Sequence, residues 1–509
     1  AGAAPIIGPI VACASFGWLP TVLWIILGTI LLGGVHDFSA LAISLHSDGK
    51  SIGYVAQKLL GKPVGKLFAV FILLAMAYVL VVFLDLTATS FLPPEATPNA
   101  PLNNSEITGG IVAAASVCLV IFAMIFGKLE GTWFRKNAIY NAMTGIGLLT
   151  ISIVLAHYFP ITRQHLPFLS HRNWIIILTG YALIASILPV NILLQPRDFI
   201  SSFLLYFCMI VGIVGIVTSI FTKSLPLAQP GLLTLHHPQL GSIFPALFIT
   251  VSCGACSGFH SIVSSGSTAK QISNATDARF IAYGGMLTEG LLALIAAISF
   301  MIIPISSPMK TMSPPDIFSH GLGLIAATIG IPASIGHLLG FLAISTFLLT
   351  TLDTATRLAR YILAEILPSS LPASFKKSYV LSILCLSPVL LLSTRTYLDE
   401  RGHIVPLWKS LWSLFGATNQ LLGALALCIA VLWVKRYRPM TSRLSTMLLS
   451  LGTLFLCATT FLGLYNAVLE QQGSIRYIGI CILLVAIIVS LSTIKEVYRL
   501  ATFPRKETR

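Results

Sequence analysis

The sequence has 509 residues, of which 56% are hydrophobic and only 9% are charged, whereas a soluble globular domain carries about 25% charged residues. This composition excludes a soluble protein and indicates an all-α protein that crosses a lipid bilayer many times. The 31 Lys and Arg residues outnumber the 17 Asp and Glu residues. They fall in short loops between apolar runs and form no basic stripe, which excludes a nucleic-acid-binding surface.

In chain order, the first apolar run covers residues 1–13 and is too short to cross a bilayer, which takes about 20 residues of helix. We interpret it as an N-terminal half-segment, either re-entrant or the remainder of a longer protein that has further helices upstream. Thirteen full spans follow. They are predicted at residues 21–44, 67–89, 107–127, 138–158, 174–188, 199–221, 241–265, 280–304, 332–352, 378–392, 411–434, 444–468 and 478–494.

The basic residues give this layout an orientation. If the span at 21–44 runs from outside to inside, most Lys and Arg residues fall in inner loops, as cytoplasmic loops require. The C-terminus is then cytoplasmic. Because all loops are short, residues 1–509 form a single transmembrane domain. After Leu352, basic and apolar residues at helical spacing predict a helix that continues along the inner surface.

The most unusual stretch lies at residues 252–268 and reads Ser-Cys-Gly-Ala-Cys-Ser-Gly-Phe-His-Ser-Ile-Val-Ser-Ser-Gly-Ser-Thr. It follows an apolar run, but it is rich in glycine and serine. Irregular backbone survives at membrane depth only where protein buries it or where it lines a wet cavity. The stretch therefore predicts a broken helix at a substrate site. The alternative is a close helix-packing face, which small residues also permit.

Ionisable residues inside apolar spans are costly and indicate function by default. Asp37 and Glu289 have no Lys or Arg within their own spans, and a carboxylate in that position can take up and release a coupling proton. For Asp37 and its neighbour His36 the alternative is a cap near the inner end of the span. For Glu289 it is a hydrogen bond to a neighbouring helix. His260, inside the broken stretch, is the best histidine candidate for substrate contact.

Several other polar residues are compatible with either a functional or a structural role. Arg197 and Asp198 could pair as an intracellular gate, or they could form a tight turn with a capping Asp. Asp353 could cap the N-terminus of the inner surface helix. Asn419 and Gln420 form an uncharged polar pair within a span and could join helices or line a cavity.

The sequence gives no sign of a metal, cofactor, nucleotide or catalytic site. Cys253 and Cys256 have CxxC spacing, but there is no second ligand pair or βαβ context. There is no G-x-x-x-x-G-K-[ST] phosphate loop, no H-E-x-x-H zinc motif and no G-x-S-x-G elbow. We therefore expect a protein that is not an enzyme, holds no cofactor and is not driven by ATP.

Several motifs together identify a family resemblance. They read Ala-Gly-Ala-Ala-Pro-Ile-Ile-Gly-Pro at 1–9, Gly-Gly-Val-His-Asp-Phe at 33–38, Pro-Arg-Asp-Phe at 196–199, the broken stretch, Thr-Asp-Ala-Arg-Phe-Ile-Ala-Tyr-Gly-Gly-Met-Leu-Thr-Glu at 276–289, Leu-Asp-Thr-Ala-Thr-Arg at 352–357 and Leu-Trp-Ser-Leu-Phe-Gly-Ala-Thr-Asn-Gln at 411–420. The chain resembles the carbon starvation protein A family of membrane transporters over nearly its whole length. The resemblance implies a transporter of the inner (plasma) membrane that takes up peptides or pyruvate together with protons in the response to carbon starvation. It also implies the inverted repeats and broken helices of amino acid–polyamine–cation transporters.

By this resemblance, residues 1–9 and 253–265 are the two interrupted segments beside the substrate. The implied substrate-binding residues are Gly8, Pro9, Gly254, Ser257, Gly258, His260, Ser264 and Ser265. Two departures from the family stand out. Family chains carry helices before the Ala-Gly-Ala motif that this chain lacks, and glutamine is frequent where this chain has His36.

The sequence thus predicts a secondary transporter in which a small anionic nutrient or a short peptide binds between residues 1–9 and 252–268, with Asp37 or Glu289 carrying the proton. Other hypotheses remain open at this point. They are a nutrient sensor without transport, a sodium-coupled permease for another solute, and a channel.

Overall fold

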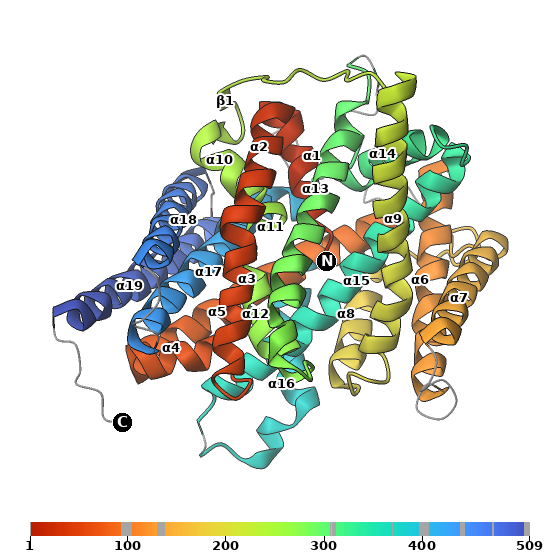
Figure 1. Cartoon of the computed structure of the whole chain (residues 1–509). Helices are drawn as coiled ribbons and strands as arrows, with labels where there is room; N and C mark the ends of the chain where they lie inside the picture. The colour runs from red at the N-terminus through yellow and green to blue at the C-terminus, as the bar shows by residue number, and fades with distance from the viewer. Residues whose placement is uncertain are drawn as a thin grey trace.

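The computed structural model of this chain describes residues 2–92, 104–129, 138–305, 307, 312–368, 370–395, 407–437, 443–470 and 473–502. Almost all of these residues are helical, which confirms the predicted all-α class (Figure 1). The described strands are β1 (His236–His237) and β2 (Gly241–Ser242), which form a short antiparallel pair. The helices are α1 (Ala4–Phe16), α2 (Trp18–Gly28), α3 (Gly34–Leu45), α4 (Ile52–Leu60), α5 (Lys62–Phe91), α6 (Asn104–Leu129), α7 (Ala138–Tyr158), α8 (His171–Ile187), α9 (Leu194–Thr222), α10 (Ile243–Thr250), α11 (Ser252–Ala255), α12 (Gly258–Gly266), α13 (Gly285–Met301), α14 (Pro314–Ala327), α15 (Ala333–Ile366), α16 (Ser378–Ser393), α17 (Leu407–Tyr437), α18 (Arg443–Glu470) and α19 (Gly473–Thr502).

Ten stretches within the described residues are helical, long and apolar enough to cross a membrane, and each coincides with a predicted span. The remaining three predicted spans have a different form. Residues 174–188 and 378–392 lie in α8 and α16, which are only 17 and 16 residues long. Residues 241–265 do not form one helix, because α10, α11 and α12 divide them. The multi-pass architecture is therefore confirmed, whereas the count of thirteen full spans is not.

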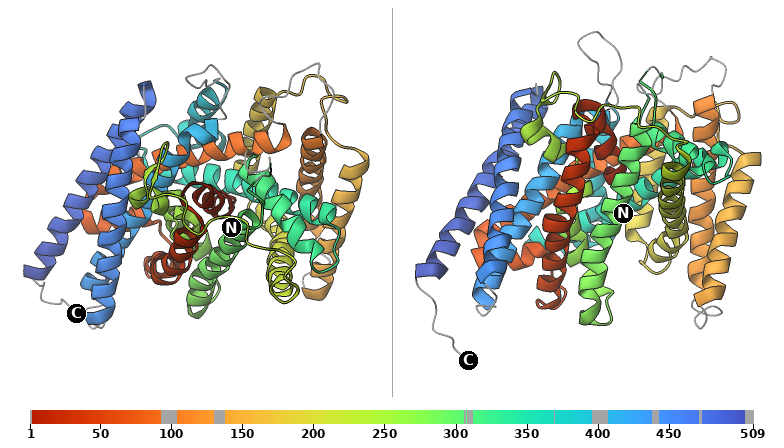
Figure 2. Two further views of the ribbon diagram at one scale, coloured as in Figure 1. Left: turned by 90° about the horizontal axis from the view of Figure 1, so that it is seen from above. Right: turned by 45° about the horizontal axis from the view of Figure 1, so that its top comes forward.

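The interior of the bundle is built around α5, α15 and α17. Their most apolar windows are 67%, 72% and 89% buried, whereas that of α7 is 17% buried. Figure 2 shows the reason, since α18 and α19 stand at one end of the molecule and α6 and α7 at the other. A helix that is apolar on all sides can face either protein or lipid. The central helices are covered by their neighbours, and the outer ones present their apolar side chains to the surroundings.

The predicted half-segment is α1, a buried helix of 13 residues with Pro9 inside it. At 1.5 Å per residue it is about 20 Å long. Gly17, with φ of 99°, then turns the chain into α2. Gly8 faces the segment that precedes α11, where a Cβ atom would collide with the carbonyl oxygen of Thr250. Glycine is needed at this position because two backbones approach each other closely.

Two features of this region differ from the predictions. They are the position of Asp353 within α15 and the presence of an additional helix, α14, before it. Helix α15 continues past Leu352 to Ile366, as predicted, but Asp353 does not cap the N-terminus of a separate surface helix. Asp353 lies within the continuous 34-residue α15 and is fully buried, as are Arg357 and Arg360 to more than nine tenths. The segment between the spans at 280–304 and 332–352, where no helix was predicted, contains the 14-residue α14. Its short apolar length hid it from a search for full spans.

Candidate functional site

The predicted break in the helix at residues 252–268 is present. Helix α11 ends at Ala255, Cys256 and Ser257 adopt extended backbone, and α12 begins at Gly258. A side chain of α17 satisfies the interrupted backbone, because Asn419 Oδ1 accepts a hydrogen bond from the Phe259 N–H at 2.8 Å. A Cβ atom on Gly258 would collide with the Asn419 carbonyl oxygen. Both predicted roles of the small residues are therefore present, since these residues break the helix and also let α12 pack closely on α17.

The break brings His260 between two carboxylates from other helices. Its Nδ1 lies 2.7 Å from Asp37 Oδ2, and its Nε2 lies 3.0 Å from Glu289 Oε2. Asp37 Oδ1 also lies 2.8 Å from His36 Nδ1. His36, Asp37 and Glu289 are almost completely buried. When both ring nitrogens carry a hydrogen, His260 can donate to both carboxylates, so its two contacts fit an imidazolium held by Asp37 and Glu289.

The two carboxylate-bearing helices share a local feature that the sequence analysis missed. A π-helical turn at Thr29–Gly33 directly precedes α3, and another at Phe280–Gly284 directly precedes α13. Such turns shift the side chains that follow them and occur often at functional sites. Gly33 and Gly34 allow close packing here, because a Cβ atom on Gly33 would collide with the Ala255 carbonyl and one on Gly34 would lie 2.6 Å from the Tyr283 ring. The Gly-Gly pairs in the motifs at 33–38 and 276–289 were the sequence feature from which these turns could have been predicted.

A cavity of about 210 Å³ lies against this charged centre. A water molecule occupies about 30 Å³ of liquid, so the cavity has room for a solute of a few non-hydrogen atoms. Its polar lining comes from Ser257 and His260 at the break, from Glu289 on α13, and from Asp198, Thr350, Thr351 and Thr354 on α9 and α15. Gly2, Ala4, Pro5, Val79, Phe83 and Phe415 are among the other lining residues. The site can therefore enclose a small solute beside an imidazolium and two carboxylates.

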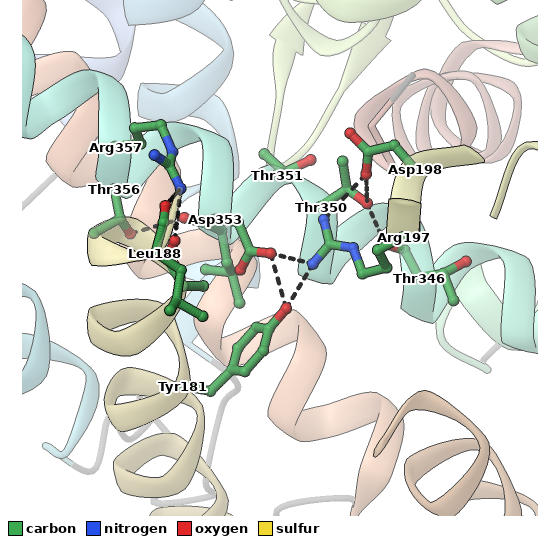
Figure 3. A network of polar contacts seen from close by, with 12 residues as sticks. Tyr181, Leu188, Arg197, Asp198, Thr346, Thr350, Thr351, Asp353, Thr356 and Arg357 are labelled. Atoms are coloured by element: carbon green, nitrogen blue, oxygen red, sulfur yellow. Dashed lines mark hydrogen bonds and ion pairs between the residues drawn. The ribbon is translucent and has the colours of Figure 1, made fainter. Parts of the chain in front are cut away.

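A second polar network adjoins the same cavity (Figure 3). Arg197 forms an ion pair with Asp353 and donates a hydrogen bond to the Tyr181 hydroxyl at 2.6 Å. The same hydroxyl donates to Asp353 Oδ2 at 2.8 Å. Asp198 Oδ1 accepts longer contacts, both of 3.2 Å, from Arg197 Nη2 and from Thr350 Oγ1. The predicted Arg197–Asp198 contact exists, but the shorter and more deeply buried contacts of Arg197 join α9 to α15 and α8.

The structure contradicts the alternative interpretation of Arg197 and Asp198 as a tight turn with a capping Asp. Arg197 and Asp198 do not sit in a turn between spans, because both lie in the first turns of α9. A further arginine of α15 strengthens the junction, as Arg357 donates to the carbonyl oxygens of Ala185 and Leu188 at 2.7 and 2.6 Å. A cation at the C-terminal end of a helix stabilises the last carbonyl groups. The start of α9 and the end of α8 are therefore both fixed to α15.

Of the residues predicted to bind substrate, Ser257 and His260 line the cavity. Gly254 lies 3.0 Å, measured from an added Cβ, from Ala293 and acts as a packing position, as Gly8 does. Ser265 donates to the Ser261 carbonyl and accepts from the Ile52 N–H, which attaches α4 to α12. Pro9 and Ser264 are not among the cavity-lining residues that the structure describes.

The two polar residues of α17, Asn419 and Gln420, have different roles. Asn419 supports the break, and Gln420 donates to Thr459 of α18 at 3.0 Å, so that it joins two helices. The cavity hydroxyls of Thr350, Thr351 and Thr354 were not predicted. Their signal was a polar face at helical spacing at the end of an otherwise apolar span.

These features define the class of protein, which is a polytopic helical membrane protein with a solute-sized cavity at an interrupted helix and buried charged groups around it. The sequence profile described as "Carbon starvation protein CstA" matches residues 1–319 and 304–463. The chain belongs to this family, which confirms the resemblance found in its motifs.

Two relatives place the chain within the family. It is 30% identical over 501 residues to the peptide transporter CstA of Escherichia coli (strain K12), covering 86% of this chain and 69% of that protein. It is 29% identical over 547 residues to the pyruvate/proton symporter BtsT of the same organism, covering 91% and 72%. Among solved structures, a manganese transporter of Eremococcus coleocola aligns with 95% of this chain and 96% of its own, at 12% identity and a TM-score of 0.40.

Proposed function

We propose that this protein is a secondary active transporter of the bacterial inner membrane that imports a small carboxylate nutrient, pyruvate or a short peptide, together with a proton. The observation that carries the proposal is the position of His260, which bridges Asp37 and Glu289 at the wall of a solute-sized cavity. The relatives are named as a peptide transporter and a pyruvate/proton symporter, and both substrates have a carboxylate.

The chemistry follows from the charges. A substrate carboxylate entering the cavity has two positive groups to approach, the His260 imidazolium and the N-terminal end of α12, whose backbone dipole favours anions. Substrate binding then stabilises the proton on the Asp37–His260–Glu289 unit, and the proton stabilises the bound substrate in return, because the two effects are reciprocal. Loss of the proton on the side of lower proton activity leaves the substrate beside two carboxylates with a neutral ring. Substrate release follows.

The interrupted helix lies where the transport cycle requires helices to move relative to one another. Secondary transporters alternate access by rocking one group of helices against another around a fixed central site. In this chain α12 is attached to α17 through Asn419, while α9 and α15 carry the other polar wall of the cavity. We propose that the Arg197–Asp353–Tyr181 network closes the side of the cavity at which α8 ends and α9 begins. The excess of basic residues in alternate loops supports a cytoplasmic location of that side and of the C-terminus.

The test is uptake into proteoliposomes of labelled pyruvate and of labelled dialanine, with and without an inward proton gradient. We expect the gradient to drive accumulation of at least one of them. Glu289→Gln and Asp37→Asn should abolish uphill accumulation, because a neutral amide no longer stabilises the coupling proton on the Asp37–His260–Glu289 unit, while folded protein is still recovered. Glu496→Gln on α19, far along the sequence and paired with Arg499 in a partly exposed contact, is the matched control and should transport normally.

Two outcomes would contradict the proposal. Unchanged proton-driven uptake by Glu289→Gln would remove that residue from coupling. Absence of gradient-driven accumulation of either solute by the unmodified protein, with folded protein present in the liposomes, would refute the proposed transport itself.

A further inference from the structure

The cavity has a second acidic side chain that the proposed proton site does not use. Asp198, on α9, lines the cavity together with Thr350 and Thr354 of α15. Its side chain retains 41% of its exposure, whereas that of Asp353, the other carboxylate of the network, retains 1%. Asp198 is therefore the member of this network that a solute in the cavity can reach.

Arg197 cannot neutralise both carboxylates that it contacts. It carries one positive charge, and its closer ion pair is with Asp353, which also accepts from the Tyr181 hydroxyl. Among the described residues, the contacts to Asp198 are the two longer ones of 3.2 Å, both through its Oδ1 atom (Figure 3). The network of Arg197, Asp353 and Asp198 therefore carries one net negative charge, and this charge lies on the carboxylate that faces the cavity.

The proton site contributes a second net negative charge. Asp37 and Glu289 together carry two negative charges, and His260 supplies one positive charge when it donates to both. The cavity-lining residues that the structure describes include no Lys or Arg. A monocarboxylate substrate would bring the total to three negative charges around one cavity, where salt screens partly buried charges much less than exposed ones, so their mutual repulsion opposes substrate binding.

We propose that Asp198, with the hydroxyl groups of Thr350 and Thr354, is a second cation subsite, which takes one monovalent cation, a proton or Na⁺, into the cavity together with the substrate. This inference rests on the proposed function, to which it adds a stoichiometry. One positive charge enters at the Asp37–His260–Glu289 unit and one at Asp198. Uptake of a monocarboxylate is then electrogenic, with one net positive charge moving inward per substrate.

The chemistry of the subsite suits either cation, and one monovalent cation is enough to balance its charge. A carboxylate oxygen and neighbouring hydroxyl oxygens are hard ligands of the type that small cations prefer. A proton needs only the carboxylate. The titratable groups that face Asp198 are Arg197 on its own helix, Asp353 on α15 and Tyr181 on α8 through Arg197, and His260 and Glu289 across the same cavity. One added positive charge neutralises the excess on this side of the cavity.

The experiment measures the steady-state accumulation of labelled pyruvate in proteoliposomes against an imposed membrane potential at fixed proton gradient. One net charge moving across 100 mV corresponds to about 2.3 kcal/mol. We therefore expect about 50-fold greater accumulation at 100 mV, inside negative, than at zero potential. One cation per pyruvate would give no dependence on potential. Labelled dialanine, which has no net charge, would move two positive charges instead of one.

The variant Asp198→Asn keeps acceptors for Arg197 and Thr350 and removes the charge. It should still accumulate pyruvate on a proton gradient but lose the dependence on potential. Asp277→Asn, in an exposed connection away from the cavity, is the matched control and should behave as the unmodified protein does. Repeating both gradients without Na⁺ distinguishes the sources, because a Na⁺ subsite loses its potential-driven component and a proton subsite does not.

Each outcome bears on one proposal. Proton-driven pyruvate accumulation that is independent of potential in the unmodified protein would overturn the second subsite and leave the proposed function intact. Full retention of potential dependence in Asp198→Asn would likewise overturn the assignment to Asp198. If the unmodified protein accumulates neither solute under either gradient, the proposed function fails instead. The measurement on the unmodified protein needs no variant, so a poorly folding Asp198→Asn does not remove the test.

Discussion

The Arg197–Asp353 pair allows a prediction with a worked magnitude. Arg197 is 2% exposed and Asp353 is fully buried, so neither charge can recover its hydration if the other is removed. Breaking a buried ion pair by deleting one partner costs about 3–5 kcal/mol, because the remaining charge stays in a poorly solvating environment. For Asp353→Asn we expect the lower part of this range, about 3 kcal/mol, since Asp198 remains within 3.2 Å of the guanidinium.

The assay is the free energy of unfolding in mixed micelles, titrated with a denaturing detergent and followed by circular dichroism. Adding Arg197→Met to Asp353→Asn removes the buried guanidinium, which the exposed Asp198 compensates only in part, so the double variant should recover about 2 kcal/mol relative to Asp353→Asn alone. Glu496→Gln breaks the partly exposed Arg499–Glu496 pair and should change stability by less than about 1 kcal/mol. The reasoning fails if Asp353→Asn costs under 1 kcal/mol, or if the double variant is no more stable than the single one.

Two further predictions concern packing and cysteine chemistry. Gly258→Ala should lose about 1–3 kcal/mol in the same titration, because its Cβ atom meets backbone of α17 and overpacking costs that much. Gly147→Ala, with no atom within 4 Å of its Cβ position, should be neutral or stabilising, and equal effects at both sites would contradict the packing argument. Mild oxidation should join Cys428 to Cys457, whose Sγ atoms lie 3.9 Å apart, before either joins exposed Cys481; mass spectrometry of peptides would show a different pairing if α17 and α18 pack otherwise.

The sequence predicted most of the fold because the bilayer imposes a strong rule on hydrophobic length. The runs around residues 67–89 and 411–434 became α5 and α17, since an apolar stretch of this length has few alternatives to a helix in lipid. The rule fails for shorter elements. Helix α14 is 14 residues long, and helix α15 continues past Leu352 for another three to four turns, because a helix that protein buries need not end where the bilayer ends.

The site was predicted in part, for a reason that can be read from individual residues. His260, Asp37 and Glu289 were each identifiable, because polar residues in apolar spans are rare. That all three meet could not be deduced, since the contacts join residues 223 positions apart, such as Asp37 and His260, and long-range pairing leaves no local pattern. The pairing of Arg197 with Asp353, 156 positions away, was hidden in the same way, and Asp198 was the visible but weaker partner.

The support that Asn419 gives to the interrupted helix has a consequence for synthesis of the protein. The Phe259 N–H finds its acceptor 160 residues later in the chain, and a ribosome takes about 8–30 s to add that many residues. During this interval the nascent chain holds an unpaired backbone donor that lipid cannot satisfy. We therefore expect the segment at residues 252–266 to reach its final position only after α17 has been inserted.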